Sequence, residues 1–506
     1  MRLFLLCLLI AFPQTTQSWD FTTFICDKWE LLKSKITDFI RGSNETLTIE
    51  QEDFLTKLNE TNPDDEDFVA KLKEIRKSVL EELKNNDHPD SEAIAKMIKK
   101  FTKKVIKHIR KTGDRLEDVN EKLNVSGNYY QGDMKLTKEQ MNKLHPTDGS
   151  VEKRQAMAAG YGASKWSTVY YSFNANLPAH TKTVAQLAIQ FWTSYTCINF
   201  AQSTTARSRI NIFQGDGCYS YVGNIGTVQD LSLGVGCDSV GTAAHELGHA
   251  LGFFHEQSRY DRDNSIELVA ANVANGWLDQ FDKETTTTNN NLGMSYDYGS
   301  IMQYSGTSAS KNGQPTMRAR TTQYQDTMGS DIVSFIDVSM MNTLYNCKSL
   351  CNSSPTQCAN GGFPHPRDCS KCICPGGYGG NYCTERPTGC GSSLNATSTP
   401  QTFSGKVGTG VYQEQDQFVF CNWVITAPAG KKIQATIKTY TQAACTSGCV
   451  YGGMEMKWQQ DQTLTGSRYC CSSDAGETVT SQSNIMPIIG FNRYGQEQFT
   501  VQYVAV

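Results

Sequence analysis

The placement of the cysteines is the feature that most restricts how this 506-residue chain can fold. Sixteen of its 18 cysteines lie after Gln155, in groups of four, six and six, and an even number in an exported chain implies disulfide bonds. The second group crowds six cysteines into about thirty residues, too few to bury a sufficient core without crosslinks. The groups are Cys197, Cys218, Cys237 and Cys347; Cys351, Cys358, Cys369, Cys372, Cys374 and Cys383; and Cys390, Cys421, Cys445, Cys449, Cys470 and Cys471.

The first eighteen residues have the pattern of a secretory signal. Arg2 supplies the positive start, Leu3 to Phe12 form a short apolar run, and Thr16-Gln17-Ser18 gives a small-residue cleavage context. A membrane anchor, the alternative, needs about 20 apolar residues, and this run is much shorter. The sequence therefore predicts a secreted, extracellular protein with no membrane span, from which residues 1–18 are removed.

Charge divides the rest of the chain into two parts. Between Trp19 and Arg154, 52 of 136 residues are charged, against 45 of the 352 residues from Gln155 onward. Apolar residues recur at helical spacing up to about Asn120, which predicts amphipathic helices packed loosely or against a partner surface. Cys26 lies alone in this segment and is expected to be unpaired or intermolecular. The net charge of −4 gives no electrostatic signal for nucleic acid.

Periodicity predicts an α+β domain followed by a β domain. Alternation predicts strands at 169–173 and 209–213, and helical spacing predicts helices at 183–194 and 334–344. From about Cys390, short alternating runs such as 417–420 and 433–437 predict an all-β sandwich.

The stretch from His245 to His255 reads HELGHALGFFH. In a helix, His245 and His249 lie one turn apart on one face, Gly252 can end the helix, and His255 can return as a third ligand. Three imidazoles and one water make a tetrahedral zinc site with an open position, and Glu246 is placed to act on the water as general base. The alternative is a surface histidine pair, but the five fixed positions arise by chance in about one chain in 10⁵.

This extended motif is the metzincin signature, and its continuation resembles the astacin family of zinc peptidases. The segment 256–263, EQSRYDRD, carries a Glu directly after the third His, and 296–304, YDYGSIMQY, is similar to the astacin Met-turn. The resemblance implies that Met302 forms the floor under one Zn²⁺ and that Tyr304 stabilises the oxyanion. Gln303 replaces a common His and Tyr260 a common Pro, and neither touches a proposed ligand.

The resemblance also implies a zymogen. Glu256 would meet a new N-terminus near Gln155 or Ala156, which favours processing after Lys153-Arg154 over a merely solvated basic pair. Tyr130-Gln131-Gly132-Asp133 is similar to the family's F-x-G-D switch, so Asp133 would occupy the position of the water on zinc. By itself, a Gly-Asp pair is usually a turn.

Two further modules are implied by resemblance. The spacing Cys372-x-Cys374 with eight residues to Cys383 resembles the end of an EGF-like domain, and Cys421-Asn422-Trp423-Val424-Ile425 resembles a CUB domain. Cys449-Val450-Tyr451-Gly452-Gly453 lacks the Asp through which many CUB domains bind calcium, which argues against calcium. Pairing among Cys445, Cys449, Cys470 and Cys471 stays open. The pairs that the resemblance implies are Cys197–Cys347, Cys218–Cys237, Cys351–Cys369, Cys358–Cys372, Cys374–Cys383 and Cys390–Cys421.

The predicted organisation is a signal (1–18), a helical propeptide (19–154), an α+β metzincin peptidase domain (155–348), an EGF-like domain (349–386) and a CUB sandwich (390–506). One EGF-like and one CUB unit resemble nematode-type astacins, which implies extracellular matrix or cuticle proteins as substrates and protein partners for both modules. The loop 311–331 is expected to shape substrate preference.

Two alternative functions are those of an inactive adhesion protein and of a zinc hydrolase acting on another bond. N-glycan acceptor motifs start at Asn44, Asn59, Asn124, Asn352 and Asn395.

Overall fold

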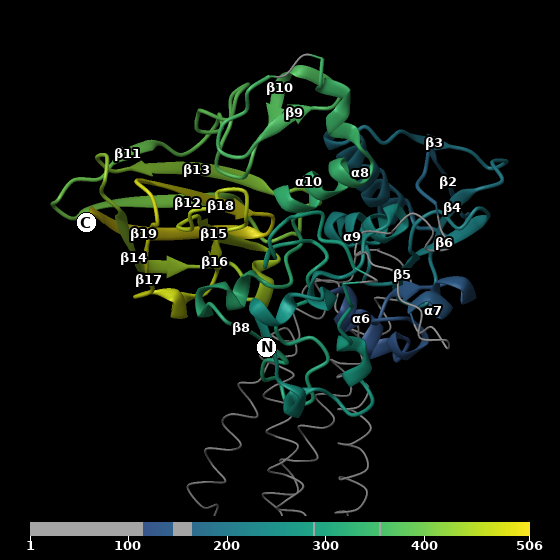
Figure 1. Cartoon of the computed structure of the whole chain (residues 1–506). Coiled ribbons are helices and arrows are strands. Elements are labelled where there is room, and N and C mark those ends of the chain that lie inside the picture. Colours follow the sequence, from purple (N-terminus) through teal and green to yellow (C-terminus); the bar gives the residue numbers. More distant parts are fainter. Residues whose placement is uncertain (1–114, 145–163, 287–288, 354–355) are drawn as a thin grey trace, which may run out of the picture. The chain divides into compact units, whose positions relative to one another are not determined.

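Figure 1 shows the computed structural model, which describes residues 115–144, 164–286, 289–353 and 356–506. These residues belong to one unit of the chain, Ile109–Val506. None of the described helices is long and apolar enough to cross a membrane. The predicted features outside the described residues are the signal, the helices before Leu116, Cys26, Lys153-Arg154, the new N-terminus at Gln155 or Ala156, and the acceptors Asn44 and Asn59.

A six-stranded sheet in the order β1-β5-β6-β4-β2-β3 is the scaffold of residues 164–347, called here the central region. Strand β5 runs antiparallel to β6, and the other neighbours are parallel. The strands predicted at 169–173 and 209–213 are confirmed. The strand bounds are β1 Met134–Lys135, β2 Val169–Phe173, β3 Phe200–Gln202, β4 Arg209–Phe213, β5 Cys218–Tyr221 and β6 Val228–Leu233.

Helices α8 (Ala179–Tyr195) and α9 (Val240–Leu251) pack against each other and share the sheet's hydrophobic core. Trp192 is fully buried there, and its Nε1 donates to the carbonyl oxygen of Ala244 (3.1 Å). The helix predicted at 183–194 is confirmed and starts earlier, directly after Pro178. The other elements of this region are α10 (Phe335–Leu344), β7 (Ile266–Leu268) and β8 (Met317–Ala319), and the 3-10 helices η2 (Glu256–Ser258), η3 (Arg262–Asn264), η4 (Ala270–Asn272), η5 (Leu278–Phe281), η6 (Thr322–Thr327) and η7 (Cys347–Cys351).

Residues 115–144, called here the leading segment, pack on the central region. They form α6 (Leu116–Leu123), η1 (Ser126–Asn128), β1 and α7 (Lys138–Leu144). Val119 is buried in the same core as α8 and α9. The side chain of Asn120 donates to the carbonyl oxygens of Gly132 (3.1 Å) and Cys218 (2.7 Å) and accepts from the Cys218 N–H (2.8 Å). The partner surface of this part of the charged segment is therefore the chain itself.

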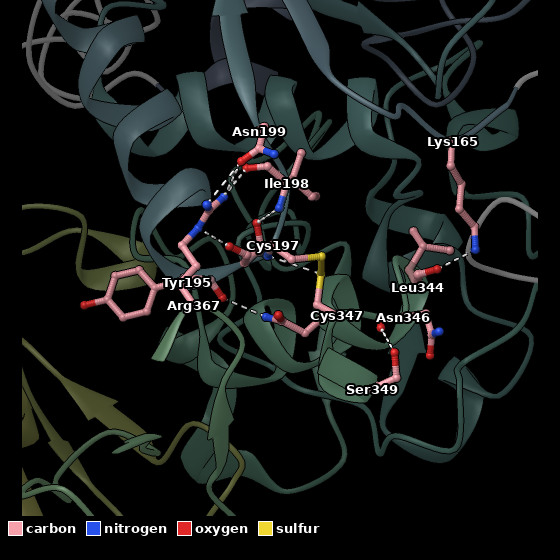
Figure 2. The surroundings of a disulfide bond; sticks show 12 residues. Lys165, Tyr195, Cys197, Ile198, Asn199, Leu344, Asn346, Cys347, Ser349 and Arg367 are labelled. Atoms are coloured by element: carbon pink, nitrogen blue, oxygen red, sulfur yellow. Dashed lines mark hydrogen bonds between the residues drawn. A yellow bond between two sulfur atoms is a disulfide. The ribbon is translucent and has the colours of Figure 1, made fainter. Parts of the chain in front are cut away.

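Eight disulfides crosslink the described chain. Six join the same cysteines that the resemblance implies. The pairs that the sequence left open are Cys445–Cys471 and Cys449–Cys470. Cys197–Cys347 closes a loop of 150 residues and ties the end of α8 to the end of the central region (Figure 2). A crosslink over so long a loop removes much of the conformational freedom of the unfolded chain.

In the described part of the cysteine-rich segment (residues 351–383), β9 (Phe363–His365) and β10 (Asp368–Ile373) form one small sheet. Arg367 in the turn between these strands reaches the C-terminal end of α8 (Figure 2). Its Nε donates to the carbonyl oxygens of Thr193 and Thr196 (both 2.7 Å), and Nη2 donates to that of Ile198 (2.7 Å). A cation at this position satisfies the unpaired last carbonyls of the helix and complements its dipole.

The C-terminal β region (residues 390–506) consists of two sheets that share one core. Their orders are β11-β13-β18-β15-β16 and β12-β19-β14-β17. Trp423 and Ile488 of the first sheet meet Ile437 and Phe499 of the second. The predicted β architecture is confirmed. The bounds are β11 Ser393–Asn395, β12 Gln401–Val411, β13 Val419–Thr426, β14 Ile433–Thr441, β15 Gly452–Met456, β16 Ser467–Tyr469, β17 Thr478–Thr480, β18 Ile485–Asn492 and β19 Gly495–Ala505, with η8 Ser447–Cys449 and η9 Ser472–Asp474.

Buried polar contacts join the C-terminal β region to the central region. Thr465 donates from its N–H and its hydroxyl to the carboxylate of Asp297 (both 3.1 Å), which is 1 % exposed. Arg493 forms an ion pair with Asp331 (2.6 Å). The second half of the loop 311–331 therefore contacts this β region, whereas its predicted role in substrate preference stays a prediction.

Glu497 should make the stability of the C-terminal β region depend on pH. It is fully buried on β19, and burial raises its pKa to about 7. A raised pKa stabilises the fold at pH values below the unfolded pKa of about 4.3, and this contribution is lost as the pH rises through 7. We expect Glu497→Gln to be more stable than the wild type by up to about 3 kcal/mol at pH 9, and the difference to shrink to about 1 kcal/mol at pH 5. Guanidinium unfolding from pH 5 to 9 measures it.

The exposed Glu477 provides the matched control, since its side chain stays in water in both states. Glu477→Gln should differ from the wild type by a constant amount across this range. Parallel curves for the wild type and Glu497→Gln would contradict the prediction.

Candidate metal centre

Helix α9 carries the first two histidines because its sequence starts and stops a helix at the right residues. The Ser239 hydroxyl accepts from the Thr242 N–H (3.0 Å) at the start, and Gly252 ends the helix in the left-handed conformation at φ 115°. The intervening turns bury His245 and His249 almost completely. The chain then turns back and brings His255 to them, with ring centroids 4.8 Å from those of His249.

Each histidine is held through its Nδ1 atom. Nδ1 of His245 donates to the carbonyl oxygen of Ile301 (2.7 Å), and Nδ1 of His249 to that of Phe253 (2.8 Å). Nδ1 of His255 lies 3.2 Å from Oε1 of Gln131 in the leading segment. A carbonyl oxygen can only accept, so Nδ1 carries the proton and Nε2 offers its lone pair.

The carboxylate of Asp133 lies among the three Nε2 atoms. Its oxygens are 3.0 Å from His245, 3.1 Å from His255 and 3.4 Å from His249. Burial would raise the pKa of Asp133, but the histidines around it, above all His255 and His249, hold this pKa well below its ordinary range. One ligand atom from each of the four residues fits within 4.8 Å of the others.

This donor set suits zinc. Three imidazole nitrogens and one carboxylate oxygen are among the ligands that Zn²⁺ takes in tetrahedral sites. Within the described residues, His249 Nε2 and Asp133 Oδ1 are buried and have no hydrogen-bond partner. Because such atoms are costly to bury unpaired, a cation between them is the natural partner.

Glu246 follows the first histidine and is fully buried. Neither of its carboxylate oxygens has a hydrogen-bond partner in the described part of the chain. Burial, together with the negative charge of Asp133, raises the pKa of Glu246 well above its ordinary value. A carboxylate in this setting has an increased affinity for a proton.

The turn that contains Met302 lies under the histidines. Sδ of Met302 is 3.0 Å from the place where a Cβ on Gly248 would be, so a larger residue at position 248 would crowd it. The hydroxyl of Tyr304 donates to the carbonyl oxygen of Gln131 (3.2 Å), and its ring centroid is 4.4 Å from that of His255. Both side chains are buried.

Comparison with known proteins identifies the family. Residues 159–346 match the Astacin peptidase family. Zinc metalloproteinase nas-31 of Caenorhabditis elegans is 49 % identical over 408 residues, covering 79 % of this chain and 67 % of that protein. Zinc metalloproteinase nas-27 of the same species is 33 % identical over 412 residues, which cover 77 % of this chain and 93 % of that protein. The chain belongs to the astacin family.

In two further matches, less than two thirds of one of the two compared chains is covered. Zinc metalloproteinase nas-32 of Caenorhabditis elegans is 39 % identical over 396 residues, so the chain spans 60 % of its length. The structure of high choriolytic enzyme 1, a hatching enzyme zinc-protease from the medaka fish Oryzias latipes, is 30 % identical, with a TM-score of 0.34. The match covers 38 % of this chain and 99 % of that one.

As an astacin, the chain is a zinc metalloendopeptidase, and its cofactor is Zn²⁺. Membership of this peptidase family argues against the alternative of a zinc hydrolase acting on another bond.

The two departures from the astacin pattern have local structural roles. The Tyr296 hydroxyl donates to Oε1 of Gln303, and Nε2 of Gln303 donates to the carbonyl oxygen of Tyr304 (2.8 Å). The N–H of Tyr260 donates to Oδ1 of Asn289 (3.1 Å). Within the described residues, neither side chain belongs to the group of four ligand atoms.

Glu256 is buried beside the Met-turn of this astacin. Its Oε1 accepts from Arg259 Nη1 (3.0 Å) and from the Asp297 N–H (2.9 Å), and burial raises its pKa to about 7 despite Arg259. Its predicted partner, the N-terminus freed by processing, lies outside the described residues and stays a prediction.

Several residues of the site have no motif of their own. The Asp337 carboxylate accepts from the Ile301 N–H (2.9 Å) and thereby fixes the carbonyl that orients His245. Asp337 follows Ser334 by three residues, which is the spacing of a capping box, so the sequence does indicate its role at the start of α10. For Asn120, which ties the leading segment to β5, no local sequence pattern gives such a signal.

Proposed function

We propose that this astacin is a secreted endopeptidase made as a zymogen, in which Asp133 blocks the metal centre until the chain is cut after Arg154. The observation that carries the proposal is the position of the Asp133 carboxylate, between 3.0 and 3.4 Å from all three histidine Nε2 atoms. A tetrahedral zinc site with three histidines has one more position, and a fourth ligand from the chain excludes water from it.

In the cut enzyme, His245, His249 and His255 would hold the metal. Zinc supplies a Lewis acid that polarises the scissile carbonyl and makes a water molecule more acidic. Glu246 would take the proton from the attacking water and deliver it to the leaving amine nitrogen, consistent with its raised pKa. The Tyr304 hydroxyl, which donates to the leading segment here, would then donate to the developing oxyanion.

The proposed domains are a signal at 1–18, a propeptide at 19–154, the peptidase domain at 155–348, an EGF-like domain at 349–386 and a CUB domain at 390–506. The EGF-like assignment is supported by the three disulfides of the cysteine-rich segment, and the CUB assignment by the two-sheet core. Extracellular matrix or cuticle proteins are the proposed substrates, and both modules are proposed to bind proteins. The glycan acceptors Asn124, Asn352 and Asn395 are exposed, as attachment requires.

A peptide-library assay tests the proposal. The full-length precursor and the same chain cut after Arg154 are each loaded with zinc and incubated with the library. We expect cleavage by the cut chain alone, abolished by chelator and restored by zinc. A cut, zinc-loaded chain that cleaves no peptide, or a precursor as active as the cut chain, would contradict it.

A further inference from the structure

The leading segment contacts the central region on two sides of Asp133. On one side, Met134 and Lys135 of β1 pair with Ser220 and Tyr221 of β5. On the other side, Tyr130 and Gln131 contact residues 280–284, at and just after η5. An extended substrate whose scissile bond takes the place of Asp133 meets both surfaces.

Residues 280–284 present hydrogen-bond acceptors to the leading segment. Oε1 of Glu284 accepts from the Tyr130 hydroxyl (2.7 Å) and lies 3.4 Å from Nε2 of Gln131. The carbonyl oxygen of Asp282 lies 3.3 Å from the same Nε2. This surface therefore binds groups that donate hydrogen bonds.

A third acceptor lies close by. Oε1 of Gln280 is buried without a hydrogen-bond partner among the described residues and lies 4.0 Å from the place of a Cβ on Gly132. A buried acceptor left unpaired by the leading segment gains from a donor that reaches it.

The surroundings suit a long side chain with a cationic end. A small cavity remains between the leading segment and the central region, lined by Gln131, Trp277, Gln280, Phe281 and Tyr304 among others. Trp277, Phe281 and Tyr304 provide apolar surface for the methylene stem of a Lys or Arg, and Gln280, in the same lining, offers an acceptor to its head.

The negative charge of this surface also favours a side chain with a cationic end. Glu284 is 4 % exposed, and its two donors from the leading segment, Tyr130 and Gln131, are both neutral. A charge-assisted hydrogen bond from an ammonium or guanidinium group is about twice as strong as one between neutral groups.

We propose that Glu284, with Gln280 and the carbonyl of Asp282, forms a subsite that selects peptide substrates with an Arg or Lys side chain within three residues of the scissile bond. This inference rests on the proposed function, because the subsite opens only when the leading segment leaves. It adds a specificity-determining residue to the peptidase and names the chemistry of its substrates.

Turnover of matched peptides tests the subsite. The zinc-loaded chain cut after Arg154 is given peptides with Arg, Lys, norleucine or Glu at each of the three positions on either side of the bond. At one position, we expect kcat/KM for Arg and Lys to exceed that for norleucine about tenfold, with Glu lowest. Glu284→Gln should reduce this ratio to about twofold or less.

Glu267→Gln is the matched control, since Glu267 is an exposed acid on β7 and is not one of the residues of the subsite. It should keep the tenfold ratio. A ratio near one at every position, or the same ratio in Glu284→Gln as in the wild type, would overturn the subsite.

A binding measurement separates failure of the subsite from failure of the proposed function. Calorimetry with the cut Glu246→Gln chain needs no turnover and uses a synthetic peptide of residues 126–137. The Tyr130→Arg peptide should bind about tenfold more weakly when Glu284→Gln is added, whereas the Tyr130→Phe peptide should change about twofold or less. Equal losses for both peptides would overturn the subsite. The expected difference, with no library peptide cleaved, would contradict only the proposed function.

Discussion

Replacing Asp133 by alanine in the uncut precursor is expected to release peptidase activity. The substitution removes the carboxylate that lies within 3.4 Å of all three histidine Nε2 atoms. Losing one partner of a buried charged set costs about 2–5 kcal/mol, so the closed state should lose about 30-fold or more in population relative to open states. Activity of the zinc-loaded precursor on a library peptide should rise by about the same factor.

The other contacts of the leading segment limit this release. The side chain of Asn120 and the pairing of β1 with β5 remain, so the Asp133→Ala precursor should stay below the chain cut after Arg154. Asp133→Asn keeps an oxygen ligand without the charge. The activity of this precursor should lie between those of the wild-type and the Asp133→Ala precursors. Glu139→Ala, at an exposed position of α7, is the control for loss of a negative charge in the leading segment. Mass spectrometry must show the precursor still uncut; an uncut, zinc-loaded Asp133→Ala precursor as silent as the wild type would refute the switch.

Glu246→Gln in the cut chain is expected to abolish turnover and to keep the metal. Loss of a general base and acid lowers kcat by about 10²–10⁴-fold. Zinc content should stay at one ion per chain, because the histidine ligands of the cut chain, His245, His249 and His255, are unchanged and Glu246 contributes no atom to the ligand cluster. Steady-state kinetics and metal analysis on the same sample measure both quantities.

A histidine variant provides the contrast. His249→Ala should lose both zinc and activity, since it removes one of three nitrogen ligands. Near-normal kcat in Glu246→Gln would refute its role as general base. Loss of zinc from that variant would instead indicate that Glu246 helps to hold the metal.

The sequence predicts those parts of the site that are formed by residues close together in the chain. His245 and His249 lie one turn of a helix apart, so their spacing alone places them on one face, with Glu246 directly beside the first of them. Asp133 lies 112 residues from His245, and a Gly-Asp pair is common in turns, so only resemblance to a family singled it out.

The same limit applies to the rest of the fold. Alternation and helical spacing predicted β2, β4 and α8 because each follows from a few neighbouring residues. The pairing of Cys445 with Cys471 and of Cys449 with Cys470 depends on how η8 lies against the end of β16, which spacing does not determine. Glu284 and Thr465 belong to no short motif, and only the folded chain brings them to their partners.

The hydrogen bonds from Thr465 to Asp297 set a lower limit on the length of an intact catalytic unit. Asp297 begins the turn that carries Met302 and Tyr304, and its own N–H donates to Glu256. A fragment trimmed to the family-matched residues 159–346 would expose this carboxylate and the surface around it. The family match therefore ends more than a hundred residues before Thr465, whose hydrogen bonds support the turn of Met302 and Tyr304. Exchange of C-terminal modules between astacins would, for this chain, alter the enzyme itself.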